Sequence, residues 1–173
     1  MLSKYERGGA GNAWLSNAWD WPGENHVQHQ VVEKCHQQGI DVIGVTKGFS
    51  AMHQIVSAMV EGGIDGLADS RMENVIELRN RGFIQPMTML RLPMLSNVTN
   101  EVWYANTSIN SEITVIKALA QAAKKLKKLH QVSLMVDVGD FREGILQENV
   151  LEIAQQISAF KSRLKWDVLW NAD

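Results

Sequence analysis

The sequence is poor in cysteine and proline, lacks a strong excess of either charge, and contains no long apolar run. Its single cysteine, Cys35, excludes an intramolecular disulfide and a zinc site built from several thiolates. A formal net charge of −2 offers no general attraction for nucleic acid or an anionic membrane. No apolar run approaches the roughly 18 residues of a membrane span, and residues 1–13 lack the apolar core of a signal peptide. We therefore expect a cytoplasmic protein that binds neither nucleic acid nor membranes.

Short apolar runs alternate regularly with amphipathic stretches from residue 40 onward. Strands are predicted to start near residues 41, 64, 87, 107, 131 and 164, with helices over 24–38, 52–61, 70–81, 98–105, 111–129 and 147–160. A spacing of about 20–33 residues is typical of βαβ units, whose strands run parallel. Because a complete eightfold barrel takes about 250 residues, the expected fold is α/β, an incomplete (β/α)8 TIM-type barrel with about five βα units.

The two parts of the chain differ in composition. Residues 1–23 contain three tryptophans among Gly, Asn and Ser and show no strand pattern, so we interpret them as an irregular segment. Residues 24–173 are interpreted as one barrel domain. Within it, Ser70 with Glu73 predicts a capping box, and Asn110 with Ser111 predicts a second helix cap.

The predicted helix at 24–38 places several metal-binding residue types on one arc. Such an arc is conceivable as a metal site, but it lies opposite an apolar stripe formed by Val27, Val31 and Cys35 and is therefore more simply a solvated face. We expect no metal. The arc consists of His26, His29, Glu33 and His36.

Lys47 is the most informative single residue. It ends the predicted buried strand 41–47 and precedes Gly48, at the position where parallel α/β folds place reactive groups. Alternation puts Ile43, Val45 and Lys47 on one face. Apolar neighbours there would favour the neutral amine, which attacks carbonyl carbons. A lysine that simply extends into water at a strand end is the alternative.

A second polar cluster follows the predicted strand at 131–138. Gly139 and Gly144 permit close backbone approach to a ligand, and Arg142 offers a planar cation for an oxyanion. A surface turn is the alternative interpretation. Asp69 and Arg91 follow two other strands and are expected at the same rim.

Taken together, these segments resemble the N-terminal barrel domain of alanine racemase-type enzymes, and most closely the ornithine/alanine racemase branch. The resemblance extends from about Val31 to Phe160, in order and at matching intervals. It is carried by VIGVTKGFSA (42–51), IDGLADSRMENV (64–75), MLRLPML (89–95), SINSEITVI (108–116) and LMVDVGDFREGI (134–145).

The resemblance implies a domain that binds pyridoxal 5′-phosphate (PLP) and racemises a small amino acid. Lys47 matches the lysine that forms the internal aldimine and acts as one base, and Arg142 matches the arginine near the cofactor's phenolic oxygen. Arg91 is carried over only as a substrate-binding residue at the mouth. The family is homodimeric, with a second base expected from the C-terminal domain of a partner subunit.

The chain also departs from the family pattern. The stretch before residue 24 lacks the expected apolar first strand, and residues 165–173 lack the residue that should pack on the cofactor ring. We therefore expect a form truncated at both ends. Two other functions stay open at this point: a non-catalytic or vestigial PLP-binding fragment, and a cofactor-free lyase that uses Lys47 directly on a carbonyl substrate.

Overall fold

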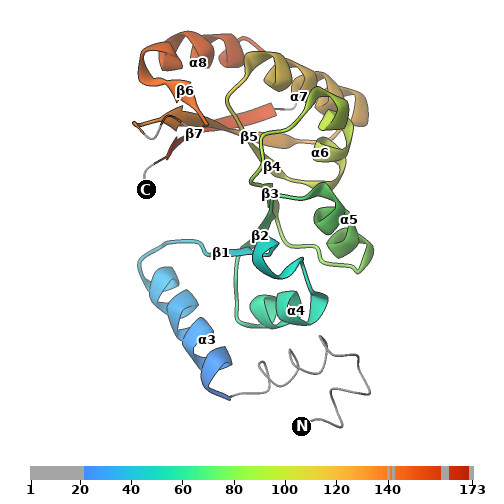
Figure 1. Ribbon diagram of the computed structural model, residues 1–173, viewed down its shortest axis with the longest axis vertical. Helices are drawn as coiled ribbons and strands as arrows, with labels where there is room; N and C mark the ends of the chain where they lie inside the picture. Colours follow the sequence, from blue (N-terminus) through green and yellow to red (C-terminus); the bar gives the residue numbers. More distant parts are fainter. Residues whose placement is uncertain (1–21, 140, 142, 161–163, 172–173) are drawn as a thin grey trace.

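The computed structural model describes residues 22–139, 141, 143–160 and 164–171. It consists of a curved parallel sheet with helices along one side (Figure 1). The strands are β1 (Ile43–Val45), β2 (Gly66–Asp69), β3 (Met87–Met89), β4 (Thr107–Asn110), β5 (His130–Asp137), β6 (Ile145–Leu146) and β7 (Leu164–Asn171). The helices are α3 (Pro22–Gln37), α4 (His53–Glu61), α5 (Met72–Asn80), α6 (Val98–Tyr104), α7 (Ile113–Leu126) and α8 (Val150–Ser158). None of these helices is long and apolar enough to cross a membrane.

Every strand pairing in the described sheet is parallel, with the order β1-β2-β3-β4-β5-β6. β7 pairs with β5 along all eight of its residues. Because β6 also pairs with Val136 and Asp137, it must occupy the opposite edge of β5 from β7, beyond the end of β4. The parallel order confirms the predicted α/β, incomplete barrel fold. The two-residue strand β6 was not predicted.

The hydrophobic core lies between the sheet and its helices. One cluster joins Leu67 and Met87 to the buried faces of α4 and α5, and the other joins Val132 and Leu134 to α7 and α8. Strand alternation and parallel register place these residues on one face of the sheet. We call this the helix face and the opposite one the inner face.

The inner face at β1 is exposed. Ile43 and Val45 are 52% and 43% exposed, whereas Gly44 between them is buried on the helix face. Strand 41–47 was predicted to be buried on both sides, and that prediction is wrong. β1 is the edge of the described sheet and no described residue covers its inner face.

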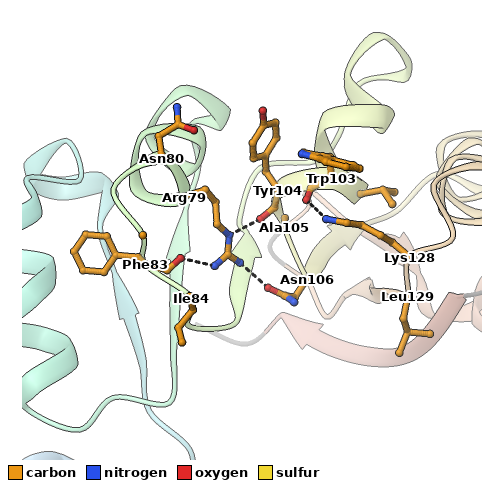
Figure 2. A pocket seen from close by; sticks show the side chains of 12 residues that line it. Arg79, Asn80, Phe83, Ile84, Trp103, Tyr104, Ala105, Asn106, Lys128 and Leu129 are labelled. Atoms are coloured by element: carbon orange, nitrogen blue, oxygen red, sulfur yellow. Dashed lines mark hydrogen bonds between the residues drawn. The ribbon is translucent and has the colours of Figure 1, made fainter.

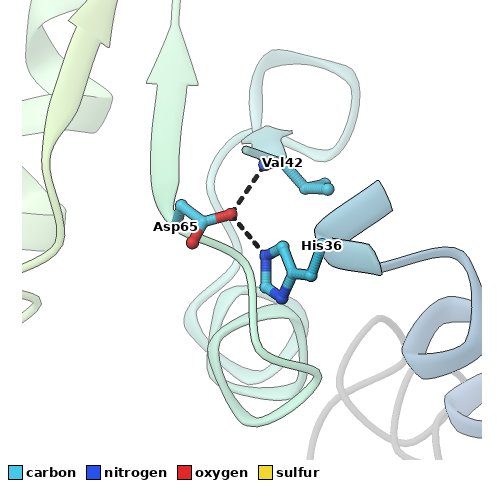
Figure 3. A network of polar contacts seen from close by, with 3 residues as sticks. All are labelled: His36, Val42 and Asp65. Carbon is cyan, nitrogen blue, oxygen red and sulfur yellow. Dashed lines mark hydrogen bonds and ion pairs between the residues drawn. The ribbon is translucent and has the colours of Figure 1, made fainter. Parts of the chain in front are cut away.

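Helix α3 is fastened to the sheet by Asp65, which directly precedes β2. Its Oδ2 accepts a hydrogen bond of 2.7 Å from the backbone N–H of Val42 and contacts Nε2 of His36 at 2.8 Å (Figure 3). These bonds, the Val42 amide first, hold the pKa of the Asp65 carboxyl below its ordinary value. They join the end of α3 to the strands β1 and β2.

The buried stripe of α3 differs from the predicted one. Val32 is 3% exposed and belongs to the core, whereas Val31 is 52% exposed. His29 and Glu33 are exposed, and the described residues contain no group of three or more side chains placed to hold a metal ion.

Both predicted helix caps are wrong. α5 begins with Arg71 at the N-cap and α7 with Glu112, and neither side chain makes a capping hydrogen bond. At α5 the acceptor comes from the preceding strand, because Asp69 Oδ1 accepts the Arg71 backbone N–H at 2.8 Å. Asn110 instead donates to the backbone oxygen of Ser108.

Candidate active site at the carboxyl end of β1

Lys47 lies at the carboxyl end of β1, where it begins the 3-10 helix Lys47–Phe49. It is exposed, and the strand's alternation ends before it, because Thr46 already has helical backbone angles (φ −99°, ψ −10°). The predicted position at a strand end is therefore confirmed. The apolar, water-poor surroundings that we expected for the amine are absent from the described residues, because the inner face at β1 is open.

The backbone beside Lys47 is held by a buried network around Asp69. Thr46 Oγ1 donates to Asp69 Oδ2 at 2.6 Å, and Asn74 Nδ2 donates to the same oxygen at 3.0 Å. Thr46 and Asp69 are fully buried. The Thr46 backbone N–H also donates to the Ala68 oxygen at 2.8 Å. The network joins β1, β2 and α5 immediately next to the lysine.

Asp69 was expected at the rim beside Lys47, and that expectation is wrong. The register pairs Leu67 with Gly44, so Leu67 and Asp69 point to the helix face, where Asp69 is fully buried, whereas Lys47 is exposed. Asp69 is therefore a structural acceptor rather than a group that a ligand could reach.

The turn after β5 is shaped by Asp137 and two glycines. Asp137 Oδ1 accepts the backbone N–H groups of Gly139 at 2.7 Å and Phe141 at 3.2 Å. Gly144 has φ +144°, and a Cβ placed there would lie 2.7 Å from the Asp137 backbone nitrogen. The glycine is thus required for the close approach of its backbone to that of Asp137, whereas the predicted close approach of both glycines to a ligand stays a prediction. Arg142, the second predicted cofactor residue, lies outside the described residues.

Arg91 lies at the same end of the sheet but lines a separate cavity. This cavity of about 120 Å³, which we call the α5–α6 cavity, is bounded by residues 70–73 at the start of α5, Met89, residues 91–94, Asn97 and Glu101. Lys47 does not line it. This cavity therefore does not bring Arg91 and Lys47 together, and the substrate-binding role of Arg91 stays a prediction.

Glu101 on α6 is the polar residue at this end that sequence reasoning missed. It is 3% exposed, and its Oε2 has no hydrogen-bond partner among the described residues. Burial raises its pKa to about 7. A signal was available, because Glu101 lies on the same helical stripe as Val98, Val102 and Ala105, where an acidic residue is unusual.

A second buried polar group lies between β4 and β5. Ser108 Oγ and His130 Nε2 share a hydrogen bond of 2.8 Å, and Asn110 Nδ2 donates to Ser108 Oγ at 3.0 Å. All three side chains are buried. Burial lowers the pKa of His130 to about 4. These residues are on the helix face, where the network joins neighbouring strands.

The opposite end of the sheet carries a larger cavity, of about 680 Å³ (Figure 2). Arg79 lies at its centre and donates to the backbone oxygens of Phe83, Gln85 and Tyr104 at 2.8–2.9 Å and to Asn106 Oδ1 at 2.8 Å. Lys128 Nζ lies 4.3 Å from the centre of the Trp103 ring. Arg79 thereby clamps the two loops that lead into β3 and β4.

Residues 26–171 match the family model described as "Alanine racemase, N-terminal domain". The chain belongs to this family. The match reaches beyond Phe160, where we expected the resemblance to stop, and includes the whole of β7.

Two curated racemases are similar to this chain over most of its length. It is 41% identical to an ornithine racemase of Acetoanaerobium sticklandii over 69% of the chain and 35% of that protein. It is 33% identical to a lysine racemase of Thermotoga maritima over 73% of the chain and 36% of that protein. The chain thus spans about a third of the length of these curated relatives.

Solved structures show the same fold. An alanine racemase of Clostridium difficile superposes with a TM-score of 0.74 at 17% identity, over 85% of this chain and 39% of that one. PipY of Synechococcus elongatus, solved with PLP bound, superposes with a TM-score of 0.71 at 14% identity, over 84% of this chain and 70% of that one. Both likenesses support the barrel architecture.

Proposed function

We propose that this chain is the cofactor-carrying part of a PLP-dependent amino-acid racemase, with Lys47 as the residue that holds PLP. The observation that carries the proposal is the position of the Lys47 amine. Lys47 is exposed at the carboxyl end of β1, where the Thr46–Asp69 hydrogen bond fixes the adjacent backbone. The family to which the chain belongs supports a racemase-like domain.

The residues around Lys47 are compatible with a covalently attached aldehyde cofactor. The amine is accessible, and a Cβ placed on the neighbouring Gly48 would meet no heavy atom within 4 Å. There is therefore room beside the lysine for a ring to approach. Arg142 stays a proposed second cofactor residue, assigned by its match to the family segment. Arg91 lines a different cavity, so we leave it out of the mechanism.

In the proposed reaction Lys47 has two tasks. Its Nζ would hold the aldehyde cofactor covalently. The free, neutral Nζ accepts the proton from Cα on one face of the amino acid. When bound, PLP supplies the electron-withdrawing ring that takes up the electron pair left on Cα. The Thr46–Asp69 network keeps the lysine backbone in place between these steps.

The substrate we propose is a small or basic amino acid. The names of the relatives support this class, since they include ornithine, lysine and alanine racemases. The return of the proton on the opposite face requires a second base, which we do not assign to a described residue.

Binding of PLP without turnover is a second candidate function, and the exposure of Lys47 favours it. Proton removal from Cα benefits from a site that excludes water, because electrostatic interactions with the reacting atoms are stronger there. The described residues leave Lys47 and the inner face of β1 open to water.

Two measurements separate these functions. Purified chain mixed with PLP should develop the visible absorbance of a Schiff base, borohydride should remove it, and Lys47→Ala should never develop it. Lys165→Ala is the matched control, because Lys165 is also exposed. Exchange of the Cα hydrogen of ornithine, lysine or alanine for deuterium would then indicate racemase chemistry. A Schiff base without exchange would favour binding alone, and its absence would contradict both candidates.

A further inference from the structure

The α5–α6 cavity contains charged groups that the proposed racemase chemistry does not use. Glu101 is buried, and neither of its oxygens makes a hydrogen bond or ion pair with the described residues. A buried carboxyl with no partner is costly, and a bound ion or an ordered water is one explanation for such a group in a native protein. The side chains of Arg71 and Arg91 line the same cavity, are exposed, and pair with no described residue.

The donors around this cavity favour a negatively charged occupant. The first turn of α5 contributes backbone N–H groups that a helix leaves unpaired, together with the positive end of its dipole. The guanidinium groups of Arg71 and Arg91 add donors suited to an oxyanion. Glu73 is the opposing charge on the lining, and it is exposed.

We propose that the α5–α6 cavity binds a small oxyanion, a carboxylate or a tetrahedral anion, with Glu101 in its protonated form as a hydrogen-bond donor. A volume of about 120 Å³ suits an anionic group of a few heavy atoms. The site differs from the Lys47 site in its residues.

The protonation of Glu101 gives this site a distinctive pH dependence. Its pKa is raised to about 7 by burial, so the carboxyl is largely neutral at pH 6 and largely ionised at pH 8. The charged groups that face it are Arg71 and Glu73 on α5 and Arg91 after β3. Helix α7 packs against α6, and its charged residues Glu112 and Lys117 are exposed. An ionised Glu101 would repel the bound anion, so affinity should fall about tenfold from pH 6 to pH 8.

The experiment is a titration of the labelled chain with sodium sulfate and, separately, with sodium acetate, at an ionic strength fixed with sodium chloride. Both anions keep their charge between pH 6 and pH 8. Binding is followed by the backbone amide signals of Met72 and Glu73 in the first turn of α5. Saturation by sulfate alone indicates a tetrahedral anion and saturation by acetate alone indicates a carboxylate. Either result, or saturation by both, supports the proposal if affinity also falls about tenfold at pH 8.

Three variants make the test specific. Glu101→Gln keeps a neutral donor of the same shape, so its affinity at pH 8 should remain within about twofold of its affinity at pH 6. Arg91→Ala should weaken binding at least about fivefold, and because Arg91 is exposed this variant should still fold. Arg81→Ala is the matched control, since Arg81 is exposed and pairs with Glu77 away from the cavity.

Three results would overturn the proposal. One is no saturable change at Met72 and Glu73 with either anion, and another is affinity that does not depend on Arg91. The third is an affinity for sulfate or acetate that stays constant or rises from pH 6 to pH 8, because an ionised Glu101 would then not oppose the bound anion.

Discussion

Thr46 Oγ1 donates a 2.6 Å hydrogen bond to Asp69 Oδ2, and this buried bond joins the carboxyl ends of β1 and β2 beside the exposed Lys47. Asp69 also accepts the Arg71 backbone N–H and the Asn74 amide, so one carboxylate organises the ends of two strands and the start of α5. The proposed cofactor lysine is thus exposed, while its backbone is fixed by this network.

Thr46→Val should destabilise the fold by about 1–3 kcal/mol, because it removes the hydroxyl donor and leaves a buried carboxylate oxygen with one fewer partner. The measurement is urea unfolding. Thr46→Ser retains the hydroxyl and should lose much less stability than Thr46→Val. Equal stability of the valine and serine variants would show that the hydrogen bond does not contribute. The valine variant should also form the Schiff base with PLP more slowly.

Gly144→Ala should cost roughly 2 kcal/mol or more, since its positive φ and the nearby Asp137 backbone nitrogen leave no room for a Cβ. Gly48→Ala is the matched control. Open space surrounds that position, and the change should stay within about 0.5 kcal/mol. Thermal unfolding of both variants tests the difference, and indistinguishable midpoints would contradict it.

Arg79→Lys should destabilise the chain by about 2–3 kcal/mol, because one ammonium cannot replace the four hydrogen bonds of the guanidinium to the loops before β3 and β4. Arg81→Lys, in an exposed pair with Glu77, should cost less than about 0.5 kcal/mol. Chemical denaturation of the two variants compares the sites directly. A loss of stability in Arg81→Lys as large as that in Arg79→Lys would show that the hydrogen bonds of Arg79 to the two loops do not stabilise the fold.

His130 and Glu101 titrate with opposite effects on stability, so together they should leave the free energy of unfolding constant to within about 1 kcal/mol between pH 3 and pH 8. Burial lowers the pKa of His130 to about 4 from 6.5, so its contribution is present above pH 6.5 and is lost as the pH falls towards 4. Burial raises the pKa of Glu101 to about 7 from 4.5, so its contribution is present below pH 4.5 and is lost as the pH rises towards 7. Each effect is on the order of 3 kcal/mol.

Glu101→Gln removes the ionisation of Glu101 and so isolates its contribution to the pH dependence of stability. The variant should gain stability relative to the parent chain between pH 5 and pH 8, because its amide does not ionise. Unfolding free energies at both pH values, measured without added oxyanions, provide the comparison. Parallel pH profiles for parent and variant would show that Glu101 does not titrate in this range.

Much of the architecture follows from hydrophobic periodicity. The alternation of apolar runs with amphipathic stretches predicted six of the strands and their parallel order, because βαβ connections permit little else. Lys47 at the end of β1 and the glycine turn after β5 were found in the same way. These features depend on local sequence, which is where pattern reasoning is strongest.

The errors have different physical origins. Ser70 was expected to cap α5, but the acceptor is Asp69, two residues before the N-cap residue Arg71, which is a local contact. Val45 was expected to be buried, but exposure depends on what covers the inner face and not on the strand itself. Arg91 and Lys47 were expected together because both follow strands, but spacing along the chain does not determine which cavity a side chain lines.

The most direct test of the proposed function is to locate the site of PLP attachment. The chain is incubated with PLP, reduced with borohydride and digested, and the modified peptide is identified by mass spectrometry, with Lys165→Ala and Lys47→Ala treated in parallel. We expect modification at Lys47 in the parent chain and in Lys165→Ala, and none in Lys47→Ala. Modification spread over several exposed lysines, or undiminished in Lys47→Ala, would contradict the assignment of Lys47 as the cofactor lysine.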